Sequence, residues 1–549
     1  MPAGTELTEV SRRSLDELAP SATKIAVCQY GPSVYARLGS FQGIDVLVVC
    51  DGYSEGLRAH RRVSDKREIR FLIAERNLLE SDVKQGALGD FLTEKLLYPY
   101  HGIENSSYFE QLSYAARIRA VKEEARDLVL NYGELCRGLV VKPEFFGLSR
   151  LRRRARVFVP SMSDYLRLLE TEVRNENLTY LHDSYLATVS GVRELEVEGD
   201  NVTITDGAVD RWLKGRASEQ VVNILRESQR VFYSYLTRGR AIFLDLDLLA
   251  RELYSPLRLN ADSMRVTAEP EDPKNHLYLR TEAGMLPLNE RFSIEEIASR
   301  LRPGRQVTVS PLAGVLNEVF LLTAGKEQFV AKKFTDWHGF KWFTLNLVSF
   351  GSKLFAVSGK TRMENEYGMN RFLAKNGIKV PQVVYASLKE RTLVERYVPG
   401  VPLDKFVIKV VGQSLLSRDE YRLSHDLGDT LGRIHEVGVS MGDSKPENFV
   451  AEDGEIFAID LEQAGRRGDY AWDIAELLFY SGHYSSTQTA TRGLSEFVEA
   501  FIQGYLKRGR GKELKRAAGV RYAKVFSLWT PAPVILEITQ KLRASNATQ

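Results

Sequence analysis

The chain has 549 residues, which is too long for a single hydrophobic core, so we expect two or three domains. Hydrophobic residues make up 44% and charged residues 27% of the sequence, a balance that indicates a folded, soluble protein and excludes disordered and fibrous classes. The formal net charge of +3 is too small to indicate a nucleic-acid partner by itself.

Cysteine usage and hydropathy indicate where the protein works. Cys28, Cys50 and Cys136 lie far apart and lack metal-ligand spacing, which suits a reducing compartment. Residues 1–20 lack the apolar segment of a secretion signal. The longest uncharged, mainly apolar run, 342–352, is shorter than the ~20 residues that a membrane-spanning helix needs. We therefore expect a cytoplasmic protein without a transmembrane segment.

In the first half of the chain, expected strands alternate with expected helices. The expected elements are strands at 24–27, 44–49 and 69–74, helices over 108–131 and 207–254, and a hairpin over 192–205. The hairpin is predicted because residues alternate on both sides of the Gly199-Asp200-Asn201 turn. This pattern indicates an α/β domain over residues 1–260, ending in a helical extension.

A linker is expected at 261–295, where the sequence is rich in Pro, Glu, Asp and Asn and weakly periodic. Residues 296–549 then form a second expected domain, of the α+β class. Its expected elements are strands at 306–309, 317–322 and 327–334, a helix over 361–376, and a later helix whose buried face carries Leu423, Leu427, Leu431 and Ile434.

The most informative residues are Met-Gly-Asp-Ser-Lys-Pro-Glu-Asn at 441–448, with Ile-Asp-Leu-Glu at 459–462. They hold an Asp, a Lys, an Asn and a second Asp at the spacing that phosphoryl transfer from ATP requires. Asp443 is the candidate that accepts a proton from an attacking hydroxyl, and Lys445 is the candidate that steadies the transferred group. Asn448 and Asp460 are candidate ligands for Mg²⁺.

These motifs carry a family resemblance. Residues from about 300 to 549 resemble the protein-kinase-like superfamily, in the branch of aminoglycoside and choline phosphotransferases, RIO kinases and the kinase subunit of the tRNA threonylcarbamoylation complex. The run 443–448 is similar to a Ser/Thr-kinase catalytic loop, and 460–462 is similar to the Asp-Phe-Glu of the small-molecule phosphotransferases. The resemblance implies a bilobal α+β domain that uses ATP and Mg²⁺.

The resemblance also implies which residues contact the nucleotide. Residues 313–320 are similar to the loop that covers the phosphates, which includes Gly314 and Asn317. Residues 329–333 fit the strand whose lysine grips the α- and β-phosphates. Lys332 and Lys333 both stay open for that role, and Lys332 is preferred because it follows three apolar residues.

Two acidic residues complete the implied nucleotide site. Glu366 lies eleven residues before Gly377, the spacing expected for the glutamate that pairs with the phosphate-binding lysine. Glu395 lies in 393–400, which resembles the hinge between lobes, where backbone groups would meet adenine.

The sequence departs from the family pattern at several positions. Met441 replaces the His or Arg that usually organises the catalytic loop, and Gly314 is the one certain glycine of the covering loop. Instead of a peptide-docking activation segment, 468–476 resembles the Asp-bearing helix start of the phosphotransferases, with Asp473 expected to cap a helix or brace the loop.

We expect an ATP-dependent phosphotransferase, an atypical Ser/Thr-kinase-like enzyme acting on a hydroxyl of a protein or small molecule. The departures keep an alternative open, an ATP-binding pseudokinase or ATPase scaffold acting in RNA metabolism.

The first domain shows a partial resemblance to DNA-polymerase-β-type nucleotidyltransferases. It is carried by Gly31-Pro-Ser33 and by Asp45 on the following strand, and it implies a nucleotidyltransferase-like α/β fold. In that family carboxylates on two strands hold two Mg²⁺ ions. Here Gly43 stands where the first Asp would be and the next strand offers only Glu75, so whether the domain is catalytic stays open, and Asp45 and Asp51 equally suit a strand-flanking turn.

Two further segments allow more than one interpretation. Five arginines crowd seven positions, namely Arg150, Arg152, Arg153, Arg154 and Arg156. Guanidinium groups suit phosphate, so this cluster is a candidate RNA contact, although a run of charges is usually a solvated face. The aromatic insert 336–355 suits a membrane surface, a partner protein, the first domain, or a helical cap on the small lobe.

Overall fold

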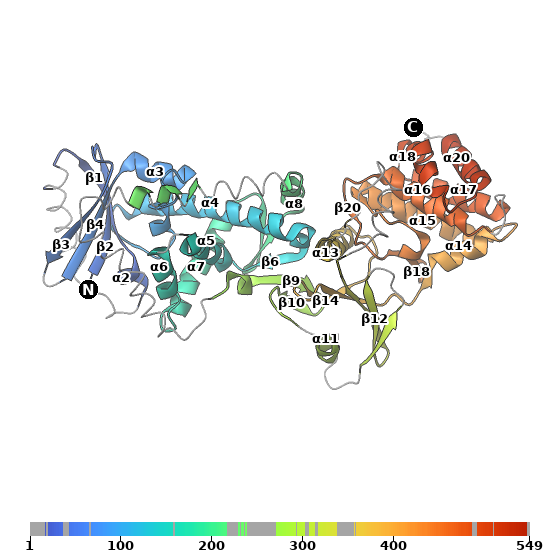
Figure 1. The fold of residues 1–549 in the computed structure, drawn as a ribbon, viewed down its shortest axis with the longest axis horizontal. Helices are drawn as coiled ribbons and strands as arrows, with labels where there is room; N and C mark the ends of the chain where they lie inside the picture. Colours follow the sequence, from blue (N-terminus) through green and yellow to red (C-terminus); the bar gives the residue numbers. More distant parts are fainter. Residues whose placement is uncertain are drawn as a thin grey trace. The chain divides into compact units, whose positions relative to one another are not determined.

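The structure is a computed structural model that divides into two compact units. The first consists of Met1–Asn131 and Val140–Leu277, and the second of Tyr132–Leu139 and Tyr278–Gln549. Figure 1 draws both. The structure describes residues 17, 20–36, 43–64, 67–157, 160–216, 229–230, 232–234, 236–238, 271–291, 294–301, 307–312, 317–336, 356, 358–485, 491–508 and 510–545.

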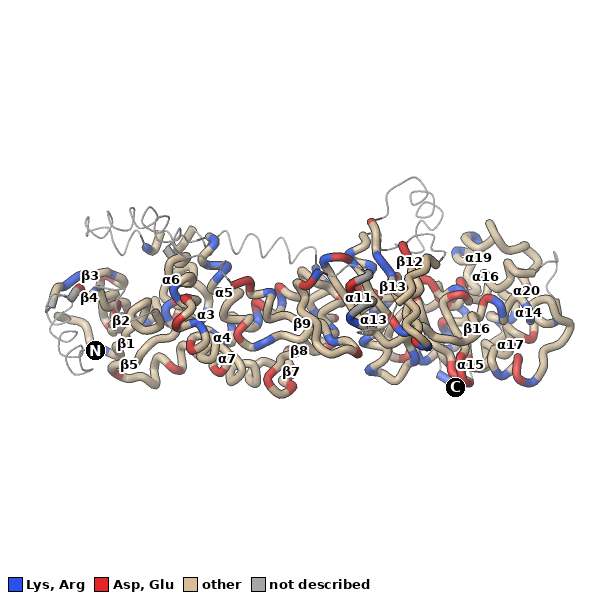
Figure 2. Tube along the Cα trace, turned by 90° about the horizontal axis from the view of Figure 1, so that it is seen from below, with Lys and Arg blue, Asp and Glu red and all other residues tan. Residues whose placement is uncertain are grey.

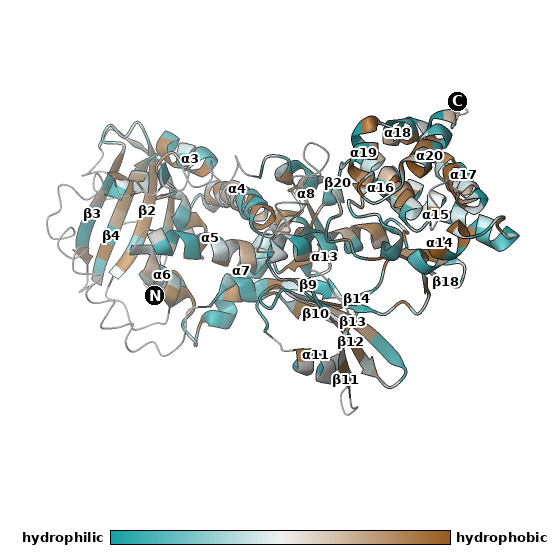
Figure 3. Cartoon of the chain, turned by 45° about the vertical axis from the view of Figure 1, so that its right-hand side comes forward, coloured by the Kyte–Doolittle hydropathy of each residue, from teal (hydrophilic) through white to brown (hydrophobic). Residues whose placement is uncertain are grey.

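A five-stranded sheet begins the first unit. Its strands are β1 (Thr23–Tyr30), β2 (Gly43–Asp51), β3 (Leu57–Ser64), β4 (Arg67–Glu75) and β5 (His101–Glu104), in the spatial order β3-β4-β2-β1-β5. β2 and β4 run parallel and the other neighbours antiparallel. The central strand β2 is buried on both faces and brown in Figure 3, whereas the edge strand β3 is teal. The three strands expected from the sequence are β1, β2 and β4.

Helices make up most of the rest of this unit. They are α2 (Pro32–Tyr35), α3 (Arg76–Gln85), α4 (Ser106–Tyr132), α5 (Glu144–Val157), α6 (Pro160–Leu168), α7 (Arg174–Val189) and α8 (Asp206–Leu213), with the 3-10 turns η1 (Thr93–Leu96) and η3 (Pro273–His276) and the short strands β6 (Leu139–Val141), β7 (Leu195–Glu198) and β8 (Asn201–Ile204). The expected hairpin is confirmed as β7–β8, with Gly199 at a φ of 60° in the turn. The helix expected over 207–254 lies mostly outside the described residues.

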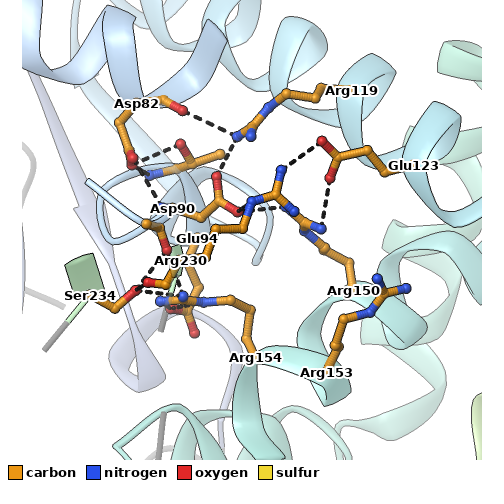
Figure 4. A network of polar contacts seen from close by, with 12 residues as sticks. Asp82, Asp90, Glu94, Arg119, Glu123, Arg150, Arg153, Arg154, Arg230 and Ser234 are labelled. Atoms are coloured by element: carbon orange, nitrogen blue, oxygen red, sulfur yellow. Dashed lines mark hydrogen bonds and ion pairs between the residues drawn. The ribbon is translucent and has the colours of Figure 1, made fainter. Parts of the chain in front are cut away.

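The arginine cluster of α5 is not a free basic surface, which corrects one interpretation of the sequence. Arg150 lies 2.5 Å from Asp90 and 2.9 Å from Glu123. Arg154 lies 3.1 Å from Glu94 and donates to the Gly89 carbonyl at 2.6 Å. Figure 4 shows these side chains pointing into the unit among carboxylates from α4 and from the segment after α3.

Two more members of the cluster are also paired. Arg153 lies 2.5 Å from Glu124 and contacts Asp127, and Arg152 lies 2.8 Å from Asp272. Arg156 is exposed. Figure 2 shows Lys and Arg interspersed with Asp and Glu around α3, α4 and α5. The physical reason is that acids distant in sequence neutralise four of the five arginines, so RNA contact through this cluster has no support in the described residues.

The second unit contains an antiparallel sheet of its own. Its strands are β11 (Thr308–Leu312), β12 (Glu318–Ala324), β13 (Glu327–Lys333), β14 (Val383–Ser387) and β15 (Thr392–Arg396), in the order β11-β12-β13-β15-β14. The three strands expected between 306 and 334 are found here, with boundaries shifted by up to three residues. Helix α13 (Gly359–Lys375) carries the helix expected over 361–376, and α11 (Ile294–Leu301) packs into the small core of this sheet through Ile297.

Residues placed in the linker by the sequence partly fold. The strands β9 (Leu277–Thr281) and β10 (Gly284–Pro287) pair as an antiparallel hairpin. Side chains of β9 alternate between buried and partly exposed, and the buried positions include Leu277 and Leu279. This apolar face explains why a polar segment still forms a strand. Of the expected aromatic insert 336–355, only Asp336 belongs to the described residues, so its interpretation stays a prediction.

The remainder of the second unit is mainly helical and shares one large core. Its elements are α14 (Leu403–Val411), α15 (Arg418–Glu436), α16 (Tyr470–His483), α17 (Arg492–Leu506), α18 (Gly511–Ala517), α19 (Val520–Phe526) and α20 (Ala532–Ala544), with β16 (Val401–Pro402), β17 (Val439–Ser440), η4 (Pro446–Asn448), β18 (Phe449–Glu452), β19 (Glu455–Ala458) and β20 (Gly465–Arg466). Within the described part of the chain, every helix is too short or too polar to span a lipid bilayer.

Helix α15 buries the face expected from its sequence. Leu427, Leu431 and Ile434 are fully buried, and a capping box between Ser417 and Glu420 begins the helix. Its close packing on α17 depends on glycine, because a Cβ at Gly428 or Gly504 would collide with the backbone of the partner helix. This helix leads directly into β17 and the 441–448 loop.

Candidate functional site

Lys332 on β13 is the centre of a buried charge cluster. Its Nζ lies 2.7 Å from Oε1 of Glu366 on α13, and 3.5 Å from Oδ1 of Asp460. Its side chain is 11% exposed, whereas that of Lys333 is 44% exposed and pairs with Glu318 at 3.5 Å. Since successive side chains of a strand point to opposite faces, only one of the two lysines can face α13, and it is Lys332.

Asp460 and Glu462 lie beside this pair. Asp460 has a φ of 59°, a left-handed conformation, and its side chain is 38% exposed. Glu462 is buried and accepts from Asn317 Nδ2 at 2.7 Å and from the Arg362 guanidinium at 3.1 Å. Asn317, expected at the phosphates, therefore contacts the segment that carries Asp460. Gly314 lies outside the described residues.

The 441–448 loop brings three more expected residues together. Lys445 Nζ lies 3.0 Å from Asp443 Oδ1, and Asn448 Nδ2 donates to the Asp443 carbonyl at 2.8 Å. The Lys445 ammonium also lies over the ring of Tyr480, 5.7 Å from its centroid. Asn448 uses its amide nitrogen to donate to the Asp443 carbonyl, so its amide oxygen can accept from, or bind, another group.

Asp473, at the start of α16, braces this loop. Of the two roles expected from the sequence, capping a helix or bracing the loop, it has the second. Its carboxylate accepts from the backbone N–H of Met441 at 2.7 Å and of Gly442 at 2.8 Å. It also contacts Nε2 of the buried His435 at 3.0 Å. Met441 is itself fully buried in the helical core, so the loop is organised by Asp473 and the missing His or Arg is not needed for its shape.

The electrostatics of the cluster follow from burial and from like charges. Burial by itself would lower the pKa of Lys332, but the carboxylates around it raise that pKa well above its ordinary value. Burial raises the pKa of Glu366 and of Glu395. Burial and the charge of Asp460 also raise the pKa of Glu462. Burial and neighbouring like charges thus favour the neutral form of these glutamates more than water would.

Lys445 differs from Lys332 in having one close acid. Burial opposes its charge, but Asp443 and Glu476 raise the pKa of Lys445 above its ordinary value. The lysine thus remains a cation beside Asp443, where it can face an anionic group arriving from solvent.

The sequence did not predict Arg362 or Asn370 as site residues, and it predicted a different position for Glu395. Arg362 and Glu366 are four residues apart on α13, a spacing that puts both on one helix face and was a usable signal. Asn370, one turn further, donates to Glu395 Oε1 at 3.1 Å. Glu395 was expected at a hinge, but its carboxylate is buried 3.6 Å from Lys332.

Asp45, Asp51 and Glu75, the carboxylates singled out in the first unit, do not come together as a metal site. Asp45 pairs with Arg70 at 2.6 Å and Asp51 with Arg76 at 3.1 Å. Glu75 caps α3 by accepting from the backbone N–H of Asn77 at 2.6 Å. Within the described ranges, no three His, Cys, Asp or Glu side chains are arranged to hold a metal ion. Two-metal chemistry by these residues has no support.

Some known proteins are similar to part of this chain. No protein-family model matches the chain. It is 26% identical over 102 residues to the KEOPS complex subunit Bud32 of Pyrococcus abyssi (strain GE5 / Orsay), a match that covers 19% of this chain and 44% of Bud32. The chain thus spans less than half the length of this relative.

Two solved structures are also similar. One is WaaP in complex with acyl carrier protein, 17% identical with a TM-score of 0.28, covering 46% of this chain and 99% of WaaP. The other, from Ralstonia eutropha JMP134, is described as an aminoglycoside phosphotransferase and is 10% identical with a TM-score of 0.27, covering 47% of this chain and 100% of that one.

Bud32 is among the kinase-like proteins that the C-terminal motifs resemble. The match to Bud32 supports a kinase-like fold for the part of the chain that matches. The nucleotidyltransferase-like fold of residues 1–260 stays a prediction.

Proposed function

We propose that the second unit is an atypical kinase, which transfers the γ-phosphoryl group of Mg-ATP to a hydroxyl of a protein or small molecule. The observation that carries the proposal is the buried Lys332–Glu366 pair, 2.7 Å apart, with Asp460 3.5 Å from the same ammonium. Kinase-like proteins need this lysine, glutamate and aspartate in place together.

The residues present fit Mg²⁺ and nucleotide phosphates. Mg²⁺ prefers oxygen ligands and is usually held by one or two carboxylates together with substrate phosphates. Asp460 offers a partly exposed carboxylate, and Asn448 offers an amide oxygen for which the described residues show no hydrogen bond. These two would hold the ion, which would neutralise charge on the phosphates. Lys332 would hold the α- and β-phosphates, with Glu366 fixing its position.

Asp443 and Lys445 suit the acceptor side of the reaction. The Asp443 carboxylate is only partly buried and can orient an acceptor hydroxyl and take its proton. Lys445 stays cationic and would stabilise negative charge on the group in transfer. Asp473 holds the loop backbone, so both side chains start from a defined geometry.

The proposal is tested by incubating the purified full chain with Mg²⁺ and γ-labelled ATP, with and without cell extract. Asp443→Asn removes the proton acceptor at constant shape, so we expect phosphoryl transfer to fall by about 100-fold or more while nucleotide binding persists. Asp453→Asn, in the exposed turn between β18 and β19, is the matched control and should transfer normally.

The alternative functions give different results in the same assay. Released phosphate without labelled acceptor would indicate an ATPase switch. Nucleotide binding without any turnover would indicate a pseudokinase scaffold. Equal transfer by wild type and Asp443→Asn would contradict the role given to Asp443.

A further inference from the structure

Glu395 is a second carboxylate aimed at the nucleotide-binding lysine. It lies on β15, beside β13, and its Oε2 is 3.6 Å from Lys332 Nζ. Its Oε1 accepts from Asn370 Nδ2, and the same amide nitrogen donates to the Pro381 carbonyl at 2.8 Å. The carboxylate is therefore held by Asn370 of α13, whose side-chain amide is itself fixed by the Pro381 carbonyl.

The charges around Lys332 do not balance. This ammonium faces Glu366, Glu395 and Asp460, which leaves a formal excess of two negative charges. The neighbouring guanidinium of Arg362 is engaged by Glu462. Asp460 is 38% exposed and can be solvated, but Glu366 and Glu395 are only 1% and 4% exposed. Two buried carboxylates thus share one buried cation.

One carboxylate oxygen of this pair has no hydrogen-bond partner within the part of the chain that the structure describes. Oε2 of Glu366 is buried and makes no hydrogen bond among the described residues. An ionised carboxylate with an unpaired buried oxygen is costly, and a neutral carboxyl group is much less so. Burial raises the pKa of both glutamates, and their mutual repulsion makes them titrate as one pair. The pair therefore takes up a proton more readily than an ordinary carboxyl group.

We infer that Glu395 is a positioning residue that competes with nucleotide phosphates for Lys332, and that protonation of the Glu366–Glu395 pair relieves the competition. The inference rests on the proposed nucleotide site. Above the pH at which the pair loses its proton, Lys332 is neutralised by two carboxylates and attracts the phosphates weakly. Below that pH one carboxylate is neutral and the lysine is free to contact the phosphates.

The test compares binding of Mg²⁺ with a non-hydrolysable ATP analogue, by calorimetry, to the full chain between about pH 6 and about pH 9. Wild type should bind more tightly as the pH falls. Glu395→Gln and Glu395→Met should both bind about fivefold more tightly than wild type at the alkaline end, as expected for removing one nearby charge. The phosphates of the ligand titrate in the same way whichever protein is tested, so they contribute a pH dependence that all variants share. Wild type should show a further pH dependence from the Glu366–Glu395 pair, and both Glu395 variants should lose it.

Glu364→Gln is the matched control, because Glu364 is an equally buried acid of α13 that faces Lys360. It should keep the wild-type affinity and pH dependence. If both Glu395 variants bind no more tightly than wild type at alkaline pH, or keep its full pH dependence, the inference is wrong while the nucleotide site stands. If folded wild type binds no nucleotide at any pH, the proposed function is wrong and the inference with it.

Discussion

Lys332 and Lys333 are neighbours on β13, yet their charged groups lie in different environments. β13 pairs antiparallel with β12 and β15, so its side chains alternate between the face toward α13 and the opposite face. Lys332 meets buried carboxylates, and Lys333 meets Glu318 at the surface. A shift of one residue in register would exchange the two, which is why the sequence left both open.

The first prediction separates these lysines. Lys332→Met should weaken Mg-nucleotide binding by about 100-fold, because it removes the cation proposed to hold the phosphates. Lys333→Met should change the dissociation constant by less than about twofold, since an exposed ion pair contributes little. Calorimetric titration of both variants checks this. Equal losses in the two variants would contradict the assignment of Lys332.

Helix α5 shows how an element can mislead when its partners are distant in sequence. Its arginines look like a basic surface in the sequence, but Asp90, Glu94 and Glu123 meet them in the interior of the first unit. Burial alone would raise the pKa of the Asp90 carboxyl, yet the guanidinium groups around it lower that pKa below its ordinary range. The helix is thus held by buried ion pairs rather than turned toward an anionic ligand.

The second prediction follows from this burial. Arg150→Met should destabilise the first unit by about 3 kcal/mol, because Asp90 and Glu123 lose a buried partner. Arg156→Met, at an exposed position of the same helix, should be neutral within about 0.5 kcal/mol. Urea unfolding of the full chain measures both. A salt-dependent RNA affinity lost in Arg156→Met would instead restore a nucleic-acid role for this helix.

Across the molecule, the division into units does not follow the order of the chain. Tyr132–Leu139 belongs to the second unit, although the residues on both sides of it belong to the first. The turn η2 (Gly133–Gly138) packs on α13, where Tyr367 donates to the carbonyls of Gly138 and Arg280 at 3.1 and 2.8 Å. A boundary placed at 261–295 would therefore separate α13 from part of its own unit.

The third prediction tests this packing. A Cβ at Gly368 would collide with the backbone of Glu134, so Gly368→Ala should destabilise the second unit by about 2 kcal/mol. It should also weaken nucleotide binding, because α13 carries Glu366. Gly412→Ala, where a Cβ would make only ordinary van der Waals contacts, is the control and should leave both unchanged. Thermal unfolding with and without nucleotide provides the measurement, and an unaffected Gly368→Ala would mean that η2 does not hold α13.

The amino-acid sequence by itself determined the local features of this protein. The chemistry of 441–448 and 459–462 depends on residues within about twenty positions of each other, and the strands β1, β2, β4 and β13 and the helices α4, α13 and α15 follow from periodicity within single segments. The tertiary structure decided which charges meet. Arg150 and Asp90 are sixty residues apart, and Glu395 and Lys332 sixty-three, so no local pattern pairs them. Burial makes these pairs necessary, because a charged side chain removed from water is costly unless an opposite charge lies beside it. Which opposite charge lies there depends on the tertiary fold.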